Sequence, residues 1–444
     1  MKIALCCCED YNFGIAYIIS YLKNKGEDVR LFFDPRQYAK PYARVIQNER
    51  LAKLLSVEDY TISEIKKFNP DITGISCMYA TRDWAVNLAE KVKNRLPSTK
   101  VVLGGVHPTL CPEDLDYPFI DDLCIGDGVK YFGGKFDPDN LWAERRMFYK
   151  VQPPIHRRIQ MFMTGFGCPF KCSYCNSPQL HRQIIRRDYQ SCIAELMQMK
   201  QDGMRYMLLN DDVFTIQKNW LKDFLPEYRK HINVPFTCFG HPKFLDDEIV
   251  SMLKDSNCRM IWLGIQSGNE ETRHKILNRI ETNKEIENSA RLIKKHGLKL
   301  MIDHIFGIPT ESEFSQYCSW RFYRKIKPDV VNCYELLYFP KTEINKYGQG
   351  NARYQKEGGE HYKMFVRSFC CIPLGRAFKI FPLWFIKGLV YIKTNRMFII
   401  RMVIENEIFY SWRAIWRRYQ RHIKLSRRLK KKLLTGQGRS MEFR

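Results

Sequence analysis

Long apolar runs are absent from this sequence of 444 residues. Crossing a bilayer takes roughly 18 to 20 uncharged apolar residues. The nearest approach, 380–392, is shorter and carries Lys387. The first residues also lack a long apolar core followed by a small-residue cleavage site. We therefore expect no membrane span and no export signal, and a cytoplasmic location.

Acidic residues are few compared with basic ones. The chain has 48 Asp and Glu against 72 Lys and Arg, which gives a formal net charge of +24. This excess indicates an anionic partner, such as nucleic acid or an anionic lipid surface, or simply a basic tail. Cysteine is not scarce, but the 16 cysteines are irregularly spaced. That spacing argues against a disulfide framework and favours a reducing compartment.

Residues 1–150 alternate short apolar runs with amphipathic stretches. The pattern predicts helices at 15–22, 57–68 and 83–95, and strands at 3–7, 29–33, 72–77 and 101–103. Strands that alternate with helices predict a parallel, doubly wound sheet, which binds ligands beyond the carboxyl ends of its strands. The adjacent cysteines at 6–8 are then buried strand residues rather than a metal site.

Residues 151–345 contain six apolar strand candidates separated by amphipathic stretches. The predicted strands are 161–165, 206–209, 236–239, 260–265, 299–306 and 330–338. This order predicts a partial (β/α)6 barrel, and barrels of this kind carry their chemistry at the carboxyl ends of the strands.

Three cysteines follow the first of these strands with the spacing C-x3-C-x2-C, at Cys168, Cys172 and Cys175. Soft sulfur ligands suit an iron–sulfur cluster, and a short loop with Gly and Pro lets all three point inward. A cubane cluster held by three cysteines keeps one iron free for a small molecule. The alternatives are a zinc site completed by His181, or buried structural thiols.

With Tyr174 directly before the last cysteine, the segment 168–175 resembles the signature of the radical S-adenosylmethionine (SAM) enzymes. The resemblance implies that a [4Fe–4S] cluster binds SAM at its open iron. After reduction by a donor such as flavodoxin or ferredoxin, the cluster would cleave SAM to a 5′-deoxyadenosyl radical. Phe166 stands where the family often has Arg, which leaves ligation intact but changes the surroundings of the cluster.

Four later segments resemble further elements of this family, in the family's order. The segment 209–214 is similar to the D-D-x-F element, so Asp211, or else Asp212, would accept hydrogen bonds from the ammonium of SAM. The segment 263–271 is similar to the ribose-binding G-x-E-S-G stretch, with Gln266 in place of Glu. The segment 305–312 matches the turn along the adenine, and 337–343 resembles the terminal Y-P-G-T-E element. The residues expected to bind SAM are Tyr174, Asp211, Asp212, Gln266, Ser267, Gly307 and Pro309.

Two loops of the N-terminal region, 103–113 and 122–128, resemble those of the cobalamin-binding domain that precedes many radical SAM cores. Glycine in such loops lets the backbone approach a large flat ligand. The D-x-H-x-x-G element, whose histidine replaces the lower axial base of cobalamin, is missing from 9–14. Either the corrinoid binds without a histidine ligand, which is the alternative that the resemblance favours, or the pocket has lost it. Its expected contacts are Tyr11, Asn12, Ser76, Gly104, Gly105, His107, Gly126 and Gly128, although His107 beside Pro108 is better explained as a turn residue.

Residues 346–444 mix aromatic, aliphatic and basic side chains. The stretch 397–416 has an amphipathic helical period, and 421–432 is predominantly basic. The pattern favours a helical cap that also contacts an anionic membrane surface, here the inner face of the membrane. The competing interpretation is that the basic tail binds the phosphate backbone of a nucleic acid, although we do not expect a nucleic acid partner.

Together these features predict an α/β enzyme with three regions. A cobalamin-binding-like Rossmann-type domain (1–150) precedes a radical SAM core (151–345) and a basic helical region (346–444). We expect methylation or another functionalisation of an unactivated carbon in a small-molecule or lipid-like substrate, with no catalytic residue yet identified. An RNA-directed methylthiotransferase is disfavoured because the N-terminal cysteines are not spaced for a second cluster. A non-catalytic sensor is disfavoured because the expected cluster and SAM ligands are all present.

Overall fold

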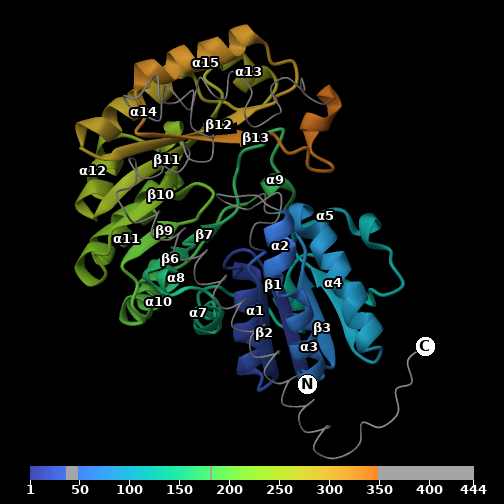
Figure 1. Cartoon of the computed structure of the whole chain (residues 1–444). Helices are drawn as coiled ribbons and strands as arrows, with labels where there is room; N and C mark the ends of the chain where they lie inside the picture. Colours follow the sequence, from blue (N-terminus) through green and yellow to red (C-terminus); the bar gives the residue numbers. More distant parts are fainter. Residues whose placement is uncertain (37–48, 181–182, 349–444) are drawn as a thin grey trace, which may run out of the picture.

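The computed structural model describes residues 1–36, 49–180 and 183–348, which form two α/β domains side by side (Figure 1). The predictions for His181 and for the tail from 349 onward, including its helical cap and membrane contact, lie outside the described residues. Within the described ranges, we find no helix that is long and apolar enough to cross a membrane.

The N-terminal domain is built on a five-stranded sheet with the order β2-β1-β3-β4-β5. All neighbouring strands are parallel, which confirms the doubly wound prediction. The strands are β1 (Lys2–Cys8), β2 (Asp28–Asp34), β3 (Ile72–Ser76), β4 (Lys100–Gly104) and β5 (Asp122–Cys124). The edge strand β5 was not predicted, because its three residues lie in a segment that we expected to be a loop.

Helices cover both faces of this sheet. They are α1 (Phe13–Asn24), α2 (Glu49–Leu55), α3 (Glu58–Phe68), α4 (Arg82–Arg95), α5 (Val106–Leu110) and α6 (Gly128–Tyr131). Successive residues of β1 enter different cores: Cys7 packs with α1, whereas Cys6 packs with α3 and α4. Both thiols are about 1% exposed, so these cysteines are buried strand residues, as predicted.

The second domain is a half-barrel whose six parallel strands have the order β13-β12-β11-β10-β9-β6. The strands are β6 (Ile159–Phe162), β9 (Tyr206–Leu209), β10 (Phe236–Gly240), β11 (Cys258–Gln266), β12 (Lys299–Phe306) and β13 (Val330–Glu335). The predicted partial barrel is confirmed, with two changes at its edges. The predicted first strand is divided between β6 and a short antiparallel ribbon, β7 (Gly165–Phe166) with β8 (Ile185–Arg186). The last strand ends at Glu335 because Leu336 turns into a separate apolar cluster.

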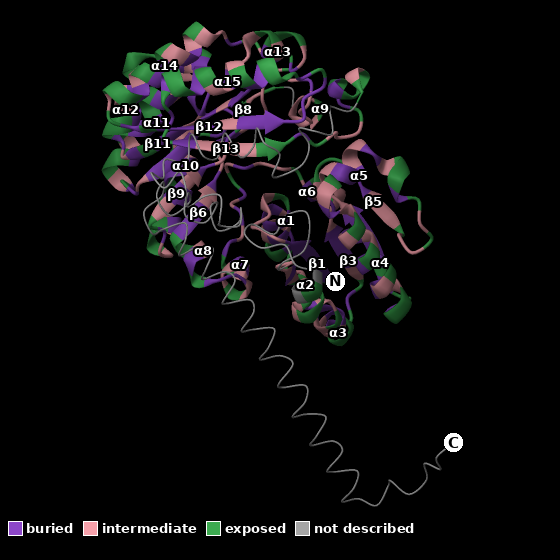
Figure 2. Ribbon diagram, turned by 45° about the horizontal axis from the view of Figure 1, so that its top comes forward, coloured by how far each residue is buried: buried purple, intermediate pink, exposed green. Residues whose placement is uncertain are grey.

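Helices pack on the outer face of the half-barrel, where the largest core lies. They are α10 (Tyr189–Gln201), α11 (Lys218–His231), α12 (Asp247–Asp255), α14 (Asn283–Lys295) and α15 (Glu313–Ile326), whereas the short helices α9 (Ser177–Leu180) and α13 (Glu270–Lys275) contribute no residue to this core. Figure 2 shows the buried strands in purple beneath helices whose outward faces are exposed.

Two short helices, α7 (Arg146–Val151) and α8 (Pro154–Arg158), connect the domains. Buried ion pairs fix this connection to the barrel, because Glu195 of α10 pairs with both Arg145 (2.5 Å) and Arg187 (2.8 Å). The boundary near residue 150 stays a prediction, and it falls within this connecting segment.

Candidate functional site

The three cysteines lie on the loop between β7 and α9, at the carboxyl end of the first barrel strand. All three are half-buried free thiols. Hydrogen bonds reach two of their sulfurs: Arg279 Nη1 donates to Cys172 Sγ (3.6 Å), and the Ser177 amide donates to Cys175 Sγ (3.4 Å). Such donors stabilise thiolates, the form that binds metal. Because burial raises the pKa of Cys168 and of Cys175 to about 11, cluster assembly would have to release protons here.

The loop is held in place by the opposite side of the barrel. The Ser173 amide donates to the Leu277 carbonyl (3.0 Å), and Ser173 Oγ donates to the Ile276 carbonyl (2.6 Å). Tyr174 is packed with Leu277 and Ile305, and its hydroxyl accepts from Arg279 Nη1 (3.1 Å). The loop is therefore positioned by packing and by hydrogen bonds to the segment after α13.

Among the described residues, the three cysteines are not found as a tight group of the kind that surrounds one metal ion. Three thiolates on one tetrahedral zinc would lie about 3.8 Å apart. Within the described ranges, the one group of three ligand-type side chains whose atoms lie within 4.8 Å of one another is elsewhere, at His107, Cys111 and Asp114. Three soft donors set further apart fit a cluster, in which each sulfur binds a different iron.

The two adjacent aspartates after β9 have different surroundings. Asp211 is buried, accepts from the Thr164 amide (2.7 Å) and Thr164 Oγ1, and pairs with Arg186 Nη1 (2.7 Å). Burial raises the pKa of Asp211, although Arg186 and Thr164 act in the opposite direction. Asp212 is exposed, and its carboxylate accepts from Ser177 Oγ (3.1 Å) just beyond Cys175. Of the two carboxylates, that of Asp212 lies beside the cysteine loop with capacity for another donor.

The other residues expected to bind SAM gather at the carboxyl ends of β11 and β12. Gln266 is buried with φ of 68°, and the ladder between β11 and β12 shifts register just before it. Ser267 Oγ lies 3.2 Å from Ser319 Oγ of α15, so this hydroxyl is already engaged. Gly307 has φ of 77°, a conformation that favours glycine, and its carbonyl accepts from the Tyr338 hydroxyl (3.0 Å). Pro309 is buried in the same turn.

The sequence analysis missed a buried network of charged residues beside the cysteine loop. Arg279 pairs with Glu281 (2.5 Å) while it contacts Cys172 and Tyr174, and Glu281 also lies 3.5 Å from His241 Nε2. Although burial alone would raise it, the pKa of Glu281 is held at about 2 by His241 and Arg279. A permanent positive charge therefore adjoins Cys172, one of the three predicted cluster ligands. No spacing rule would have identified it, because Arg279 lies 107 residues from Cys172.

The inner face of the half-barrel carries a second group that the sequence analysis missed. Trp262 Nε1 donates to Asp303 Oδ1 (2.7 Å), and Asn332 on the next strand donates to the same oxygen (3.4 Å). Phe239 stacks on Trp262 with ring centres 4.6 Å apart. Burial raises the pKa of Asp303 to about 7. The only sequence signal for this site is an acidic residue within an apolar strand.

The residues expected to contact a corrinoid lie at the carboxyl edge of the N-terminal sheet, but not as one surface. Asn12 Nδ2 donates to Ser76 Oγ (2.9 Å) across the point where the strand order reverses, between β1 and β3. Gly105 has φ of 114°, and a Cβ there would lie 2.8 Å from the Cys77 carbonyl oxygen. Gly126 has φ of 79° with open space around it, so a ligand could approach its backbone. Of the four glycines expected to contact a corrinoid, Gly126 alone has such open surroundings, since a Cβ on Gly104 would lie 3.1 Å from Cys124 Cβ.

The remaining expected contacts face elsewhere. The Tyr11 ring packs against Phe148 of the connecting segment at 4.7 Å, beside a small cavity between the domains. A Cβ on Gly128 would lie 2.3 Å from Ile18 Cδ1, so Gly128 serves packing against α1. His107 faces Asp114 rather than the strand reversal between β1 and β3.

The carboxyl ends of both sheets meet at the domain interface. Tyr79, which follows β3, packs against Phe339, which follows β13, with ring centres 5.5 Å apart. Lys341 Nζ donates to the Leu110 carbonyl (2.5 Å) after β4. Gln179 of α9, just beyond the cysteine loop, donates to the Lys341 carbonyl (2.9 Å). The segment from Phe339 to Lys341 therefore contacts both the helix that follows the cysteine loop and the carboxyl edge of the N-terminal sheet.

This arrangement defines an α/β protein with three cysteines at the open end of a half-barrel, where an iron–sulfur cluster would fit, and with the carboxyl edge of a second parallel sheet next to it. A model of the radical SAM superfamily matches residues 162–316, and a model of the B12 binding domain matches residues 11–133. The chain is a radical SAM superfamily enzyme with a B12-binding domain in front of its radical SAM domain. The expected cofactors, a [4Fe–4S] cluster, SAM and cobalamin, agree with both matches.

Individual relatives are distant. The chain is 24% identical to the uncharacterized methyltransferase PH0819 of Pyrococcus horikoshii over 70% of this chain and 77% of that protein. It is 22% identical to the anaerobic magnesium-protoporphyrin IX monomethyl ester cyclase of Rubrivivax gelatinosus, over 74% of this chain and 65% of that protein. The structure of the radical SAM methyltransferase TsrM from Kitasatospora setae, with cobalamin and a [4Fe–4S] cluster bound, shares the fold. The TM-score is 0.62 at 14% identity, over 77% of this chain and 76% of TsrM.

Proposed function

We propose that this enzyme uses cobalamin and SAM to methylate, or otherwise functionalise, an unactivated carbon of a small-molecule or lipid-like substrate. The observation that carries the proposal is the shared interface of the two carboxyl edges. Through Tyr79, Phe339 and Lys341, the B12-binding sheet and the cysteine loop border the same region. A ligand held by one sheet would therefore lie near a ligand held by the other.

Different residues of the chain would bind the cluster, SAM and the corrinoid. Cys168, Cys172 and Cys175 would hold the cluster. When bound, the cluster with SAM supplies the one-electron chemistry that activates a C–H bond, and the corrinoid supplies a transferable methyl group. Arg279 beside Cys172 favours the more negative, reduced state of the cluster.

For the ammonium of SAM, Asp212 is the better candidate of the two aspartates. Its carboxylate is exposed beside the cysteine loop and accepts one hydrogen bond, from Ser177. Asp211 already accepts from Thr164 and Arg186, and it fixes the ribbon β7–β8 instead. Gln266 would bind the ribose hydroxyls, and the turn at Gly307 and Pro309 would border the adenine.

The inner face of the half-barrel suits a substrate with an apolar or flat body and a polar hydrogen-bond donor. Phe239 and Trp262 offer aromatic surface, and Asp303 offers an acceptor whose charge changes near neutral pH. A carboxyl held by two donors is fixed in direction, so it can orient a substrate group. We assign Asp303 this orienting role.

The relatives support methyl transfer without deciding the outcome, because one of them is called a cyclase. Membrane delivery of a lipid-like substrate rests on the basic, aromatic tail from 349 onward. A liposome sedimentation assay tests it: the intact chain should partition to anionic vesicles, whereas a chain that ends near residue 360 should not. Equal partition would remove the basis for membrane contact.

The direct test of the function is anaerobic reconstitution with iron, sulfide and hydroxocobalamin. We expect a [4Fe–4S] cluster and about one corrinoid per chain, and we expect methyl-labelled SAM with a reductant to transfer label to the bound corrinoid. A chain that binds no corrinoid in excess cobalamin would contradict methyl transfer. Radical chemistry alone would then remain, and the release of 5′-deoxyadenosine would report it.

A further inference from the structure

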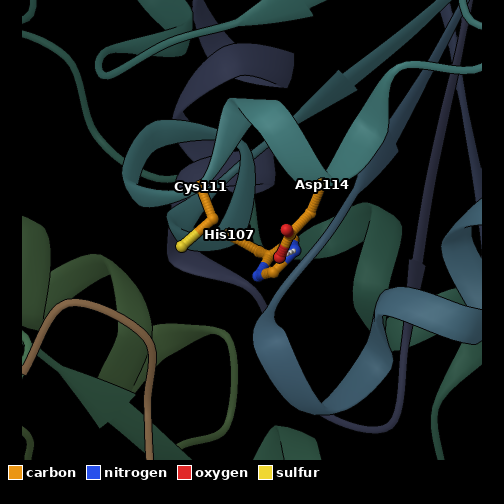
Figure 3. A group of neighbouring side chains, drawn as sticks. All are labelled: His107, Cys111 and Asp114. Atoms are coloured by element: carbon orange, nitrogen blue, oxygen red, sulfur yellow. Dashed lines mark ion pairs between the residues drawn. The ribbon is translucent and has the colours of Figure 1, made fainter. Parts of the chain in front are cut away.

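Three ligand-type side chains gather where α5 passes into the 3₁₀ turn η2 (Pro112–Leu115) (Figure 3). His107, Cys111 and Asp114 stand at positions i, i+4 and i+7, the spacing that brings side chains of consecutive helical turns to one side. One ligand atom from each lies within 4.8 Å of the others. The group is separate from the cysteine loop, which contributes none of the three.

The histidine of this group has an unmet bonding requirement. His107 is 2% exposed, and its Nε2 has no hydrogen-bond partner. Asp114 Oδ2 lies 3.4 Å from this nitrogen, within ion-pair range but not in hydrogen-bond geometry. Cys111 is also only 2% exposed. A buried nitrogen without a partner destabilises the fold, and a bond to a metal ion would satisfy it.

The distances suit one tetrahedral ion. With bonds of about 2.0 to 2.3 Å to nitrogen, oxygen and sulfur, neighbouring ligand atoms on zinc lie about 3.3 to 3.8 Å apart. The 3.4 Å between His107 Nε2 and Asp114 Oδ2 already matches such an edge. A sulfur, a nitrogen and an oxygen together suit zinc, which is borderline-soft and accepts all three.

The position of the group suggests what such an ion would do. The side chain of Asp114 is 42% exposed, so the fourth ligand position can be taken by water. The segment from α5 to η2 also contacts residues that follow β13. Tyr79 packs between His107 and Phe339. Lys341 pairs with Glu113 (2.7 Å) and donates to the Leu110 carbonyl. The segment that carries the three ligands is thus a docking surface for the radical SAM domain.

We propose that His107, Cys111 and Asp114 bind one zinc ion. The ion would fasten α5 to η2 and so hold the surface on which the segment after β13 docks. His107 would then serve the ion and not the corrinoid. The site needs neither the cluster nor SAM, so it stands or falls independently of the proposed function.

The test uses the full-length chain with Cys168, Cys172 and Cys175 replaced by alanine, so that no metal binds at the cluster loop. After treatment with a chelator and dialysis against zinc, we expect about one zinc per chain by plasma mass spectrometry. In this background, Asp114→Asn should lower zinc retention at least fivefold, and His107→Ala should abolish it. Cobalt(II) should give the thiolate charge-transfer band and strong visible absorption of a four-coordinate site, and Cys111→Ser should remove the charge-transfer band.

Matched controls separate ligation from damage to the fold. Glu113→Gln removes the neighbouring exposed carboxylate, and Cys124→Ser removes another buried thiol of the same domain. Both should keep the zinc. Less than about 0.1 zinc per chain in the background variant, or equal losses in Glu113→Gln and Asp114→Asn, would overturn the proposal. Because Asp114 is on the surface, its replacement by Asn leaves the fold intact, so a loss of zinc there reports ligation.

Discussion

Replacement of Arg279 by methionine should lower the reduction potential of the cluster. The guanidinium lies 3.6 Å from Cys172 Sγ and is buried, so its positive charge acts on the cluster with little screening. A positive charge stabilises the reduced cluster, which carries one more electron. Its removal therefore makes reduction harder, and with it the reductive cleavage of SAM.

The size of the effect follows from the distance. At an effective dielectric constant of about 20 and a charge separation of about 6 Å, one unit charge contributes about 3 kcal/mol. For a one-electron couple this corresponds to a fall of about 130 mV. In Arg279→Met/Glu281→Gln the negative charge of Glu281 is removed as well, so we expect about half that fall. Arg279→Lys keeps the charge and should stay within about 30 mV of the natural protein.

The assay is an anaerobic redox titration followed by the electron paramagnetic resonance signal of the reduced cluster. Iron and sulfide per chain are measured in each variant, so that only fully loaded protein is compared. If loaded Arg279→Met has an unchanged potential, or if Arg279→Lys falls as far as Arg279→Met, the assignment of Arg279 as an electrostatic neighbour of the cluster is wrong.

Three further predictions concern other groups. Asp212→Asn should raise the dissociation constant for SAM about tenfold or more in anaerobic calorimetry, and an unchanged constant would contradict the assignment of Asp212. Asp211→Asn should instead lower the free energy of unfolding by about 3 kcal/mol, because it removes the carboxylate that pairs with Arg186. The folded-state pKa of Asp303, about 7, lies above the ordinary value, so the stability that Asp303 contributes is present below about pH 4 and is lost as the pH rises to 7. In urea unfolding, Asp303→Asn should therefore lose less stability than the natural protein over that pH range. An identical loss in the two proteins would argue against the raised pKa. Gly105→Ala should cost about 1 to 3 kcal/mol in thermal unfolding, more than Gly126→Ala, because only the first Cβ meets a carbonyl oxygen.

The sequence was sufficient for the order of the elements because the apolar periods are strong. Every predicted strand of both sheets exists, and the boundary errors occur where local forces are weak. The strand β5 is three residues long and begins at Asp122, so its only support is pairing with β4. Nothing in its own pattern distinguishes it from a loop.

Side-chain partners at the site could not be predicted in the same way. The motif identified the pair Asp211 and Asp212, but which of them faces the cluster depends on Arg186, a residue of the ribbon β7–β8. Arg279 and Asp303 became visible only once strands far apart in sequence were placed side by side. Long-range contacts of this kind leave no mark in the local sequence, and their energies depend on burial that only the fold supplies.

The most direct test of the central claim is the reductive cleavage of SAM by the anaerobically reconstituted chain. With dithionite as reductant, the natural protein should show a [4Fe–4S] spectrum and release 5′-deoxyadenosine. The variant with alanine at Cys168, Cys172 and Cys175 should do neither. Cleavage of SAM by that variant, or a natural protein that assembles no cluster when iron and sulfide are in excess, would contradict the account.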